Sequence, residues 1–257
     1  SVLANSQPVL VRYRNGTLVL AHNGNLVNDA DVRRRLVNEG SIFQSTMDSE
    51  TIVHLIARSK LDDPEAQIRE ALARVEGAYS LIIAVNQDLY AVTDARGFRP
   101  LLLGRIGDAM VVASESCALD IMGARFCCEL EPGSFVRIRG GAIEYLEPLP
   151  AKAHTRCVFE LVYFSRPDSQ IFGESADQFR RNLGRQLARE HPVPGADCVF
   201  SVPDSSNSAA LGFSEASGVP LELALIRNHY VGRTFIHPVQ AGRDTKVKIK
   251  YNPVREV

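Results

Sequence analysis

Hydrophobic and polar positions follow two different patterns along the chain. In residues 1–150, short apolar segments end at pairs such as Asn-Gly, Gly-Asp and Gly-Gly, as expected of antiparallel strands joined by tight turns. In residues 151–257, helical spacing alternates with short apolar runs, which is typical of βαβ units and a parallel sheet. The pattern therefore predicts two domains, 1–150 and 151–257, with the boundary near Pro148, Pro150 and the polar segment after them.

The periodicity predicts individual elements within both regions. Strands are expected at 8–13, 17–21, 79–85, 89–93, 100–103, 109–113, 134–139 and 142–145. Helices are expected at about 28–40, from 48, at 64–77 and at 117–122, with Val32, Leu36 and Val37 on one face of the first. In the second region the pattern predicts a helix around Phe179, Leu183 and Leu187, a strand at 198–202, a helix at 207–216 and a strand at 221–226.

The segment His22-Asn23-Gly24-Asn25 interrupts an apolar run and has two interpretations. Asn-Gly after a short strand is a turn signal, because both residues tolerate positive φ. An Asn side-chain amide beside a Gly backbone N–H also provides two donors, which is what an oxyanion hole requires. The segment alone does not decide between a turn and a donor site, and both are compatible if a turn presents the donors.

Two further segments combine charge with a defined position. Asp48 begins a predicted helix, where an acid usually caps the helix but can also hold the ammonium group of an amino acid. The loop Asp94-Ala95-Arg96-Gly97-Phe98-Arg99 precedes a predicted strand. Without further information, this is a loop held by surface ion pairs worth less than about 1 kcal/mol.

Composition limits the classes of function. The chain has 45% hydrophobic residues and 29 basic against 30 acidic residues, as in a soluble globular protein with a real core. With a net charge of −1, no global field favours nucleic acid or an anionic membrane. We find no long apolar run that predicts a transmembrane helix and no secretory signal, so a cytoplasmic location is expected, and the five cysteines are too few for a disulfide scaffold.

Several motifs occur in a specific order. HNGNLVN, MDSE, DARGFRPL, ASES and ELEPGSFV together resemble the glutaminase domain of the class II (N-terminal nucleophile) amidotransferases. Beyond the boundary, CVFELVYFSRPDS, SVPDSSNSAA and RNHYVGRTFI narrow the resemblance to the amidophosphoribosyltransferase family of purine synthesis, and it covers essentially all 257 residues. The resemblance implies an α+β N-terminal-nucleophile-hydrolase-like glutaminase domain of stacked antiparallel sheets with helices. The start of an α/β phosphoribosyltransferase domain is expected to follow it.

The family reaction implies two substrates, glutamine and phosphoribosylpyrophosphate. An N-terminal cysteine hydrolyses glutamine with its own α-amino group as the base, and the ammonia displaces pyrophosphate from phosphoribosylpyrophosphate. By position in the family motifs, Asn23 and Gly24 match the oxyanion hole, and Asp48 matches the carboxylate that recognises the glutamine α-amino group. No nucleic acid or membrane partner is expected, and the resemblance suggests a homotetramer.

The second region carries matches to the phosphoribosylpyrophosphate and cofactor sites. Ser205 matches a position near a magnesium site, and Arg233 and Lys248 match the loop that covers the phosphates, although alternation around Lys248 also fits a solvated edge strand. Cys157 matches the first thiolate ligand of a [4Fe–4S] cluster in the iron–sulfur branch of the family. Since such a cluster takes four ligands, the other three would lie beyond residue 257.

The sequence departs from the family pattern at both ends. The family begins with a nucleophilic Cys followed by Gly, whereas this sequence begins with Ser1 and Val2. The acidic pair and the glycine-rich loop that bind magnesium and ribose phosphate in the family are also absent from it. We therefore expect an internal fragment without glutaminase activity of its own. Two alternatives stay open: a binding module that kept the fold and lost the chemistry, and another class II amidotransferase such as glucosamine-6-phosphate synthase.

Overall fold

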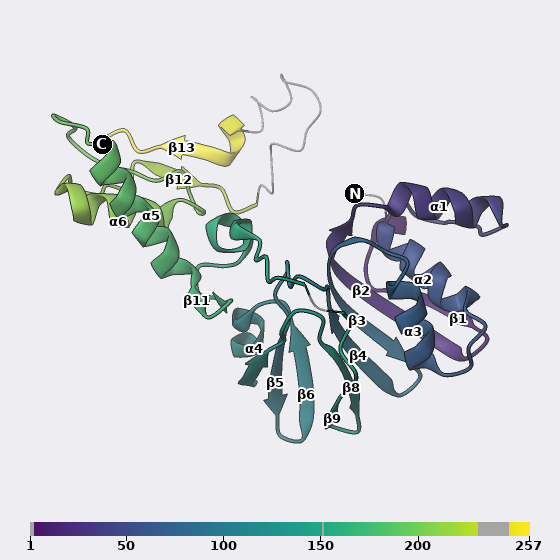
Figure 1. Cartoon of the computed structure of the whole chain (residues 1–257). Coiled ribbons are helices and arrows are strands. Elements are labelled where there is room, and N and C mark those ends of the chain that lie inside the picture. Colours follow the sequence, from purple (N-terminus) through teal and green to yellow (C-terminus); the bar gives the residue numbers. More distant parts are fainter. Residues whose placement is uncertain (1–2, 151, 231–246) are drawn as a thin grey trace. The chain divides into compact units, whose positions relative to one another are not determined.

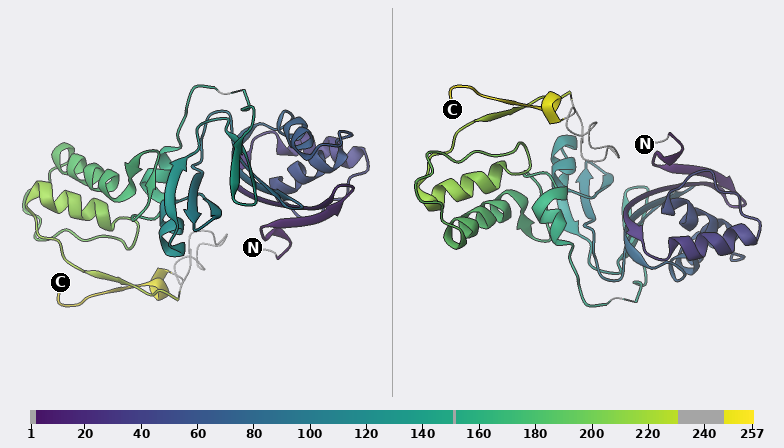
Figure 2. Two further views of the ribbon diagram at one scale, coloured as in Figure 1. Left: turned by 90° about the horizontal axis from the view of Figure 1, so that it is seen from below. Right: turned by 90° about the horizontal axis from the view of Figure 1, so that it is seen from above.

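The computed structural model divides into two compact units, Ser1–Val158 and Phe159–Val257. It describes residues 3–150, 152–230 and 247–257. Figures 1 and 2 show strands and helices together in the first unit and mainly helices, with short strands, in the second. The sequence pattern placed the boundary at residue 150, whereas the two units divide after Val158. The difference arises because Lys152, Thr155 and Cys157 donate backbone hydrogen bonds to the loop at 95–98 and so belong to the first unit.

A six-stranded antiparallel sheet is the centre of the first unit. Its order is β1-β2-β3-β4-β8-β9, in which β2 pairs with both β1 and β3. The strands are β1 (Val9–Tyr13), β2 (Gly16–Leu26), β3 (Gly77–Val85), β4 (Asp88–Thr93), β8 (Phe135–Arg139) and β9 (Ala142–Tyr145). Every pairing in the sheet is antiparallel, as the turn signals in the sequence predict.

Three helices supply apolar side chains to the core on one face of this sheet. They are α1 (Asp29–Asn38), α2 (Asp48–Arg58) and α3 (Pro64–Leu72). Leu18 and Leu20 of β2 share this core with Ile52 and Ile56 of α2, and all four are fully buried. Asp63 caps α3 through a hydrogen bond from the Ala66 N–H, as its position before Pro64 predicts.

A second antiparallel sheet, in the order β6-β5-β7, lies against the other face. Its strands are β5 (Leu102–Ile106), β6 (Ala109–Ala113) and β7 (Arg125–Glu129), and α4 (Ser116–Met122) follows β6. Leu101 and Leu103 pack with Val136 and Ile138 of the first sheet, whereas Leu102 packs with Leu119 of α4. Adjacent residues of β5 thus face opposite sides of the second sheet, one toward the first sheet and the next toward α4. The first unit therefore has four layers in the order helix, sheet, sheet and helix.

Three details of the first unit differ from the sequence-based predictions. The expected turn at His22–Asn25 is wrong, because β2 continues through Leu26 and pairs with β3 over this whole segment. Strand β7 was not predicted, since it carries only intermediate and exposed side chains and lacks a buried apolar alternation. Val37 is 51% exposed, so the apolar face of α1 is limited to Val32 and Leu36.

The second unit is built around α5 (Ala176–Glu190) and α6 (Asn207–Ser217). The two helices cross closely, because a Cβ on Gly184 would lie 1.9 Å from the Ala209 carbonyl oxygen and one on Gly212 would lie 2.0 Å from the Arg181 carbonyl oxygen. Leu183 and Leu187, whose spacing predicted this helix, are 43% and 50% exposed. The buried face of α5 instead consists of small residues and one arginine: Ala176, Arg180, Gly184 and Ala188.

Short strands complete the second unit. They are β10 (Gln170–Ile171), β11 (Glu174–Ser175), β12 (Leu225–Arg227) and β13 (Tyr251–Pro253), preceded by a π-helical turn, η2 (Glu160–Phe164), while a 3-10 turn, η1 (Leu3–Asn5), begins the first unit. The expected parallel pairing is present as a single bridge between Val199 and Leu221, and β12 pairs with β13 in the antiparallel sense. Residues 247–250 are helical, so the edge-strand interpretation of the basic run is wrong for these four positions. No helix in the described ranges is long and apolar enough to span a membrane.

Candidate functional site

Asn23 lies near the end of β2, where the strand still pairs with β3 opposite Ser80. Side chains alternate along the strand, so Leu20 and His22 point into the helical core and Asn23 points to the other face. The Asn23 side-chain oxygen Oδ1 accepts hydrogen bonds from Arg99 Nη2 at 2.8 Å and Nε at 3.3 Å. The Asn23 amide NH₂ is consequently directed away from Arg99.

Gly24 is required by a close approach of two strands. A Cβ at this position would lie 2.0 Å from the carbonyl oxygen of Ala78 and 2.8 Å from Nε2 of His22. Any side chain would therefore push β2 away from β3 at the residue next to Asn23. The glycine of the Asn-Gly pair is thus needed for the close approach of β2 and β3, and not for the turn that the sequence suggested.

Asp48 is the first residue of α2 and is attached to the same end of β2. Its Oδ2 accepts a hydrogen bond from the Leu26 N–H at 2.8 Å, and its Oδ1 lies 3.4 Å from His22 Nδ1. The N-cap position belongs to Met47, so helix capping does not account for this carboxylate. Burial raises the pKa of Asp48, but hydrogen bonds from His22 and Leu26 outweigh it and hold the pKa below its ordinary value.

The loop after β4 is organised by a buried carboxylate. Asp94 is 2% exposed and accepts hydrogen bonds from the backbone N–H groups of Tyr79, Arg96 and Phe98. This contradicts the interpretation of the loop as one held by surface ion pairs. The loop ends at Arg99, whose carbonyl oxygen accepts a hydrogen bond from Ser80 Oγ at 2.9 Å.

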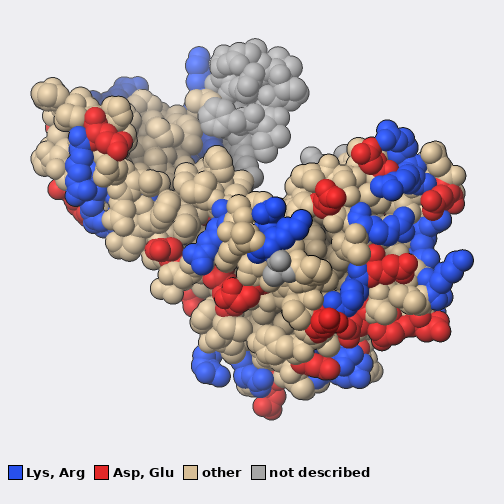
Figure 3. All heavy atoms as spheres, in the orientation of Figure 1, with Lys and Arg blue, Asp and Glu red and all other residues tan. Residues whose placement is uncertain are grey.

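A cavity of about 380 Å³ with apolar and charged walls adjoins this loop. Tyr79, Asp94, Arg96 and Lys152 contribute to its walls, so acidic and basic groups face the same space. Burial, and then the charge of Asp94, raise the pKa of Tyr79, which keeps the phenol neutral at physiological pH. On the face of the first unit drawn in Figure 3, basic and acidic side chains are interspersed without a large patch of one sign.

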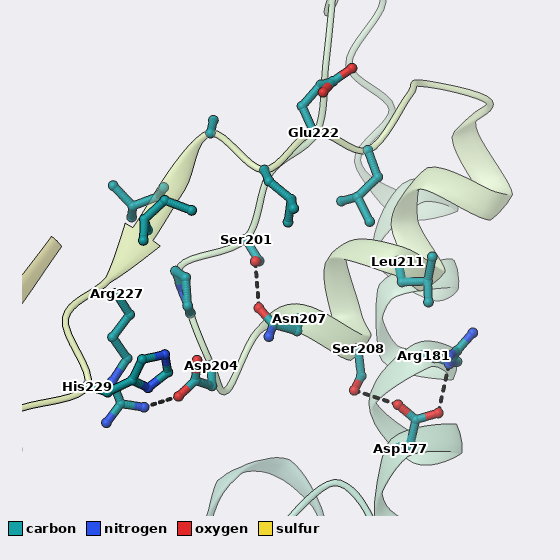
Figure 4. A pocket seen from close by; sticks show the side chains of 16 residues that line it. Asp177, Arg181, Ser201, Asp204, Asn207, Ser208, Leu211, Glu222, Arg227 and His229 are labelled. Atoms are coloured by element: carbon teal, nitrogen blue, oxygen red, sulfur yellow. Dashed lines mark hydrogen bonds and ion pairs between the residues drawn. The ribbon is translucent and has the colours of Figure 1, made fainter. Parts of the chain in front are cut away.

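In the second unit, hydrogen bonds connect the start of α6 with neighbouring elements around a cavity of about 460 Å³ (Figure 4). Asp177 of α5 accepts hydrogen bonds from Ser208 Oγ at 2.6 Å and from Arg181 Nε at 2.8 Å. The hydrogen bond from Ser208 is the largest effect and lowers the pKa of Asp177, burial partly opposes it, and the hydrogen bond from Arg181 lowers the pKa further. Asp204, in the turn before α6, pairs with Arg227 of β12.

A larger cavity of about 750 Å³ contains the predicted residue Ser205. Ser205 and Ser206 lie in its wall together with four cationic side chains: Arg166, Arg180, Arg227 and Lys250. Lys248 is exposed and does not line this cavity, whereas Lys250, two residues along, is buried and does. The sequence analysis missed Arg227, and it chose Lys248 over Lys250 within one basic run, because only the pairing of β12 with β13 brings Arg227 and Lys250 beside Ser205.

The predicted residues thus fall into separate places. Asn23, Gly24 and Asp48 share the end of β2, and Ser205 lies in the second unit. Cys157 is a partly exposed free thiol, and its backbone N–H donates to the Phe98 carbonyl oxygen. Arg233 lies outside the described residues. In the part of the chain that is described, no group of three or more His, Cys, Asp or Glu side chains could hold a metal ion.

Comparisons with known proteins agree with this arrangement. The family described as "Glutamine amidotransferase domain" matches residues 2–120. The amidophosphoribosyltransferase of Bacillus subtilis is 46% identical over 98% of this chain and 53% of its own length, and that of Methanothermobacter thermautotrophicus is 43% identical over 99% and 54%.

Solved structures give the same result. The glutamine phosphoribosylpyrophosphate amidotransferase of B. subtilis, complexed with ADP and GMP, matches with a TM-score of 0.88 over 98% of this chain and 56% of that one. The expected fold class, a class II glutaminase domain of stacked antiparallel sheets followed by part of a phosphoribosyltransferase domain, is confirmed. The chain spans about half the length of the curated relatives it matches, and over that span it belongs to the amidophosphoribosyltransferase family.

Proposed function

We propose that this chain is part of an enzyme that forms 5-phosphoribosylamine from glutamine and phosphoribosylpyrophosphate. A thiolate attacks the glutamine amide carbon, ammonia leaves, and water hydrolyses the resulting thioester to glutamate. The ammonia then attacks C1 of phosphoribosylpyrophosphate and pyrophosphate departs. The observation that carries the proposal is the attachment of Asn23, Gly24 and Asp48 to one strand end in a chain 46% identical to such an enzyme.

Asn23 and Gly24 supply the two donors for the tetrahedral intermediate. The Asn23 amide NH₂ points away from Arg99, and the neighbouring Gly24 has no side chain to obstruct its exposed backbone. Donors fixed before the reaction need no reorganisation when negative charge develops on the amide oxygen, which is why such sites lower the barrier.

Asp48 recognises the α-ammonium group of glutamine. Its lowered pKa keeps the carboxylate charged at neutral pH, and 22% of its side chain is exposed, so an incoming cation can reach it. The hydrogen bond from the Leu26 N–H fixes one carboxylate oxygen, and His22 lies beside the other. The substrate would therefore be held by its ammonium group at a fixed position relative to Asn23.

The 750 Å³ cavity of the second unit is the proposed site for phosphoribosylpyrophosphate. Its four cationic side chains outnumber its one carboxylate, Asp204, which pairs with Arg227, and this balance suits a polyanion. Ser205 and Ser206 add hydroxyl groups next to the N-terminus of α6. Arg233 and Lys248 are proposed to cover the phosphates. Ser205, an oxygen donor, fits Mg²⁺, which binds mainly through substrate oxygens and water and would neutralise the leaving pyrophosphate.

The residues at Cys157 do not by themselves fit a [4Fe–4S] cluster. A cluster takes four thiolates, and Cys157 belongs to no group of three or more His, Cys, Asp or Glu side chains among the residues described. The proposal that Cys157 is one ligand therefore requires three thiolates from elsewhere. Iron and acid-labile sulfide analysis of the anaerobically purified full-length product tests it: Cys157→Ser should lose both, and unchanged contents would refute the assignment.

The function is tested with the full-length product of the reading frame that encodes this chain. With phosphoribosylpyrophosphate and Mg²⁺, we expect glutamate and pyrophosphate in equal amounts, and ammonium chloride should replace glutamine as nitrogen source. A catalytically inactive binding module would form neither product. A sugar-phosphate amidotransferase would release glutamate without consuming phosphoribosylpyrophosphate. The homotetramer rests on the resemblance alone, and light scattering of the same preparation tests it; the cytoplasmic location is the expectation from the sequence.

A further inference from the structure

We infer that Arg99 is a positioning residue for the oxyanion hole and acts by fixing the orientation of the Asn23 side-chain amide. This inference rests on the proposed function, since it assigns Asn23 the donor role. A guanidinium group only donates hydrogen bonds, so the Asn23 atom facing it at 2.8 and 3.3 Å must be the oxygen. Rotation of the amide by 180° would place its NH₂ against the N–H groups of Arg99.

Arg99 is itself held in place from two directions. Its carbonyl oxygen accepts from Ser80 Oγ at 2.9 Å, and Ser80 is 3% exposed and is the cross-strand partner of Asn23. The following Pro100 restricts residue 99 to extended backbone conformations. The contact with Ser80 and the backbone conformation set by Pro100 therefore both hold Arg99 in the position from which its guanidinium reaches the Asn23 amide.

The loop that carries Arg99 begins at a second fixed point. Asp94, 2% exposed, accepts hydrogen bonds from three backbone N–H groups, one on β3 and two within the loop. Hydrogen bonds to a buried carboxylate are stronger than those between neutral groups, so they hold the loop against the strand. Asp94 thus supports Arg99, and Arg99 orients Asn23.

The positive charge of Arg99 has a second consequence. A cation bound to the amide oxygen polarises the amide group and makes its N–H groups better donors to a developing oxyanion. Arg99 needs no contact with substrate for this effect. Its loss should lower the rate of the chemical step more than it changes the binding of glutamine.

Amide dynamics test the orientation on this chain, whether or not it is active. In ¹⁵N-labelled protein, the Asn23 side chain should have an order parameter close to rigid backbone, about 0.85, and Arg99→Met should reduce it below about 0.6. Arg99→Lys, which keeps the charge but loses the fork of donors, should give an intermediate value. Arg34→Met is the matched control, because the Arg34 side chain on α1 is 71% exposed, and it should leave the Asn23 order parameter unchanged. An unchanged order parameter in Arg99→Met would overturn the inference.

Kinetics of the full-length protein test whether the orientation is used. Arg99→Met should lower kcat for glutamine hydrolysis about 10-fold or more with KM within about twofold, while the ammonia-dependent reaction, which bypasses the site, is preserved. In a double-mutant cycle, Asn23→Ala with Arg99→Met should be no slower than Asn23→Ala alone. Additive losses, or full kcat in Arg99→Met, would contradict the inference. Absence of glutamine hydrolysis in the wild type would instead refute the proposed function, leaving the amide measurement as the separate test.

Discussion

The Asp48 carboxylate accepts a hydrogen bond from the backbone N–H of Leu26 at 2.8 Å. The two residues belong to different elements, the first turn of α2 and the last residue of β2. His22 of the same strand lies 3.4 Å from the other carboxylate oxygen. The Asp48 side chain therefore contacts β2 two residues before Gly24 and two residues after it. This contact fixes a negative charge beside the Asn-Gly pair, and it links the strand geometry to the proposed recognition of glutamine.

Replacement of this charge should affect substrate binding more than chemistry. Asp48→Asn in the full-length protein should raise KM for glutamine about 10- to 100-fold, because a hydrogen bond to a charged group contributes about 1.5 to 3 kcal/mol. The effect on kcat should be smaller. Asp31→Asn, which removes an exposed carboxylate on α1, is the control and should leave KM unchanged. Equal KM values in wild type and Asp48→Asn would contradict the assignment.

Glu50 provides a test of stability that needs no activity. It is 8% exposed and accepts hydrogen bonds from the Gln44 and Ser45 N–H groups and from Ser45 Oγ. Burial raises the pKa of Glu50, but these hydrogen bonds outweigh it and hold the pKa below the ordinary 4.5. Glu50→Gln should lower the free energy of unfolding by about 1 to 3 kcal/mol at pH 7.

The pH dependence of that difference has a definite sign. Because the folded-state pKa of Glu50 is depressed, its contribution is fully present above pH 4.5 and is lost as pH falls through the lower folded-state value. Denaturant unfolding of wild type and Glu50→Gln should therefore give a constant difference from pH 7 to 5 that shrinks only below 4.5. A difference that grew on acidification would be incompatible with the hydrogen bonds described.

Gly24 should tolerate no side chain. Gly24→Ala places a Cβ 2.0 Å from the Ala78 carbonyl oxygen, so the strands must separate, and we expect a loss of more than about 2 kcal/mol in unfolding free energy. Gly107→Ala, at a left-handed turn position with nothing within 4 Å of the added Cβ, should cost only about 1 kcal/mol. Similar losses at both positions would show that backbone conformation, and not strand proximity, requires Gly24.

The crossing of α5 and α6 reverses an ordinary helix preference. Alanine normally stabilises a helix interior over glycine by about 1 kcal/mol. Gly184→Ala should instead destabilise the second unit, because its Cβ would lie 1.9 Å from the Ala209 carbonyl oxygen. Arg189→Ala, at an exposed position of α5, is the control and should be near neutral. Thermal unfolding that shows stabilisation by Gly184→Ala would refute the close crossing.

Much of the fold could be predicted because its signals are local. The Asp63-Pro64 start of α3, the helix beginning at Asp48 and the glycine that ends α6 all depend on neighbouring residues. The turn predicted at His22–Asn25 failed because tertiary pairing with β3 overrode the local propensity of Asn-Gly. The spacing of Leu183 and Leu187 predicted a helix but not its buried face, because apolar spacing cannot reveal that glycines form the helix contact.

The candidate site was predictable only in part for the same reason. The motifs and their order singled out Asn23, Gly24 and Asp48 as residues. Their mutual support depends on contacts far apart in sequence, such as Arg99 with Asn23 across 76 positions and Asp48 with Leu26 across 22. The buried role of Asp94 could not be inferred either, because an Asp-Ala-Arg loop has the composition of an exposed one.

The kcat of the Asn23→Ala variant shows whether Asn23 is an oxyanion-hole donor. Glutamate release from glutamine is measured at saturating substrate in the full-length wild-type and Asn23→Ala proteins, with the ammonia-dependent reaction as the folding control. Loss of one such donor should lower kcat about 10²- to 10³-fold with little change in KM. A kcat within twofold of the wild type, in a protein that retains the ammonia-dependent reaction, would contradict the claim.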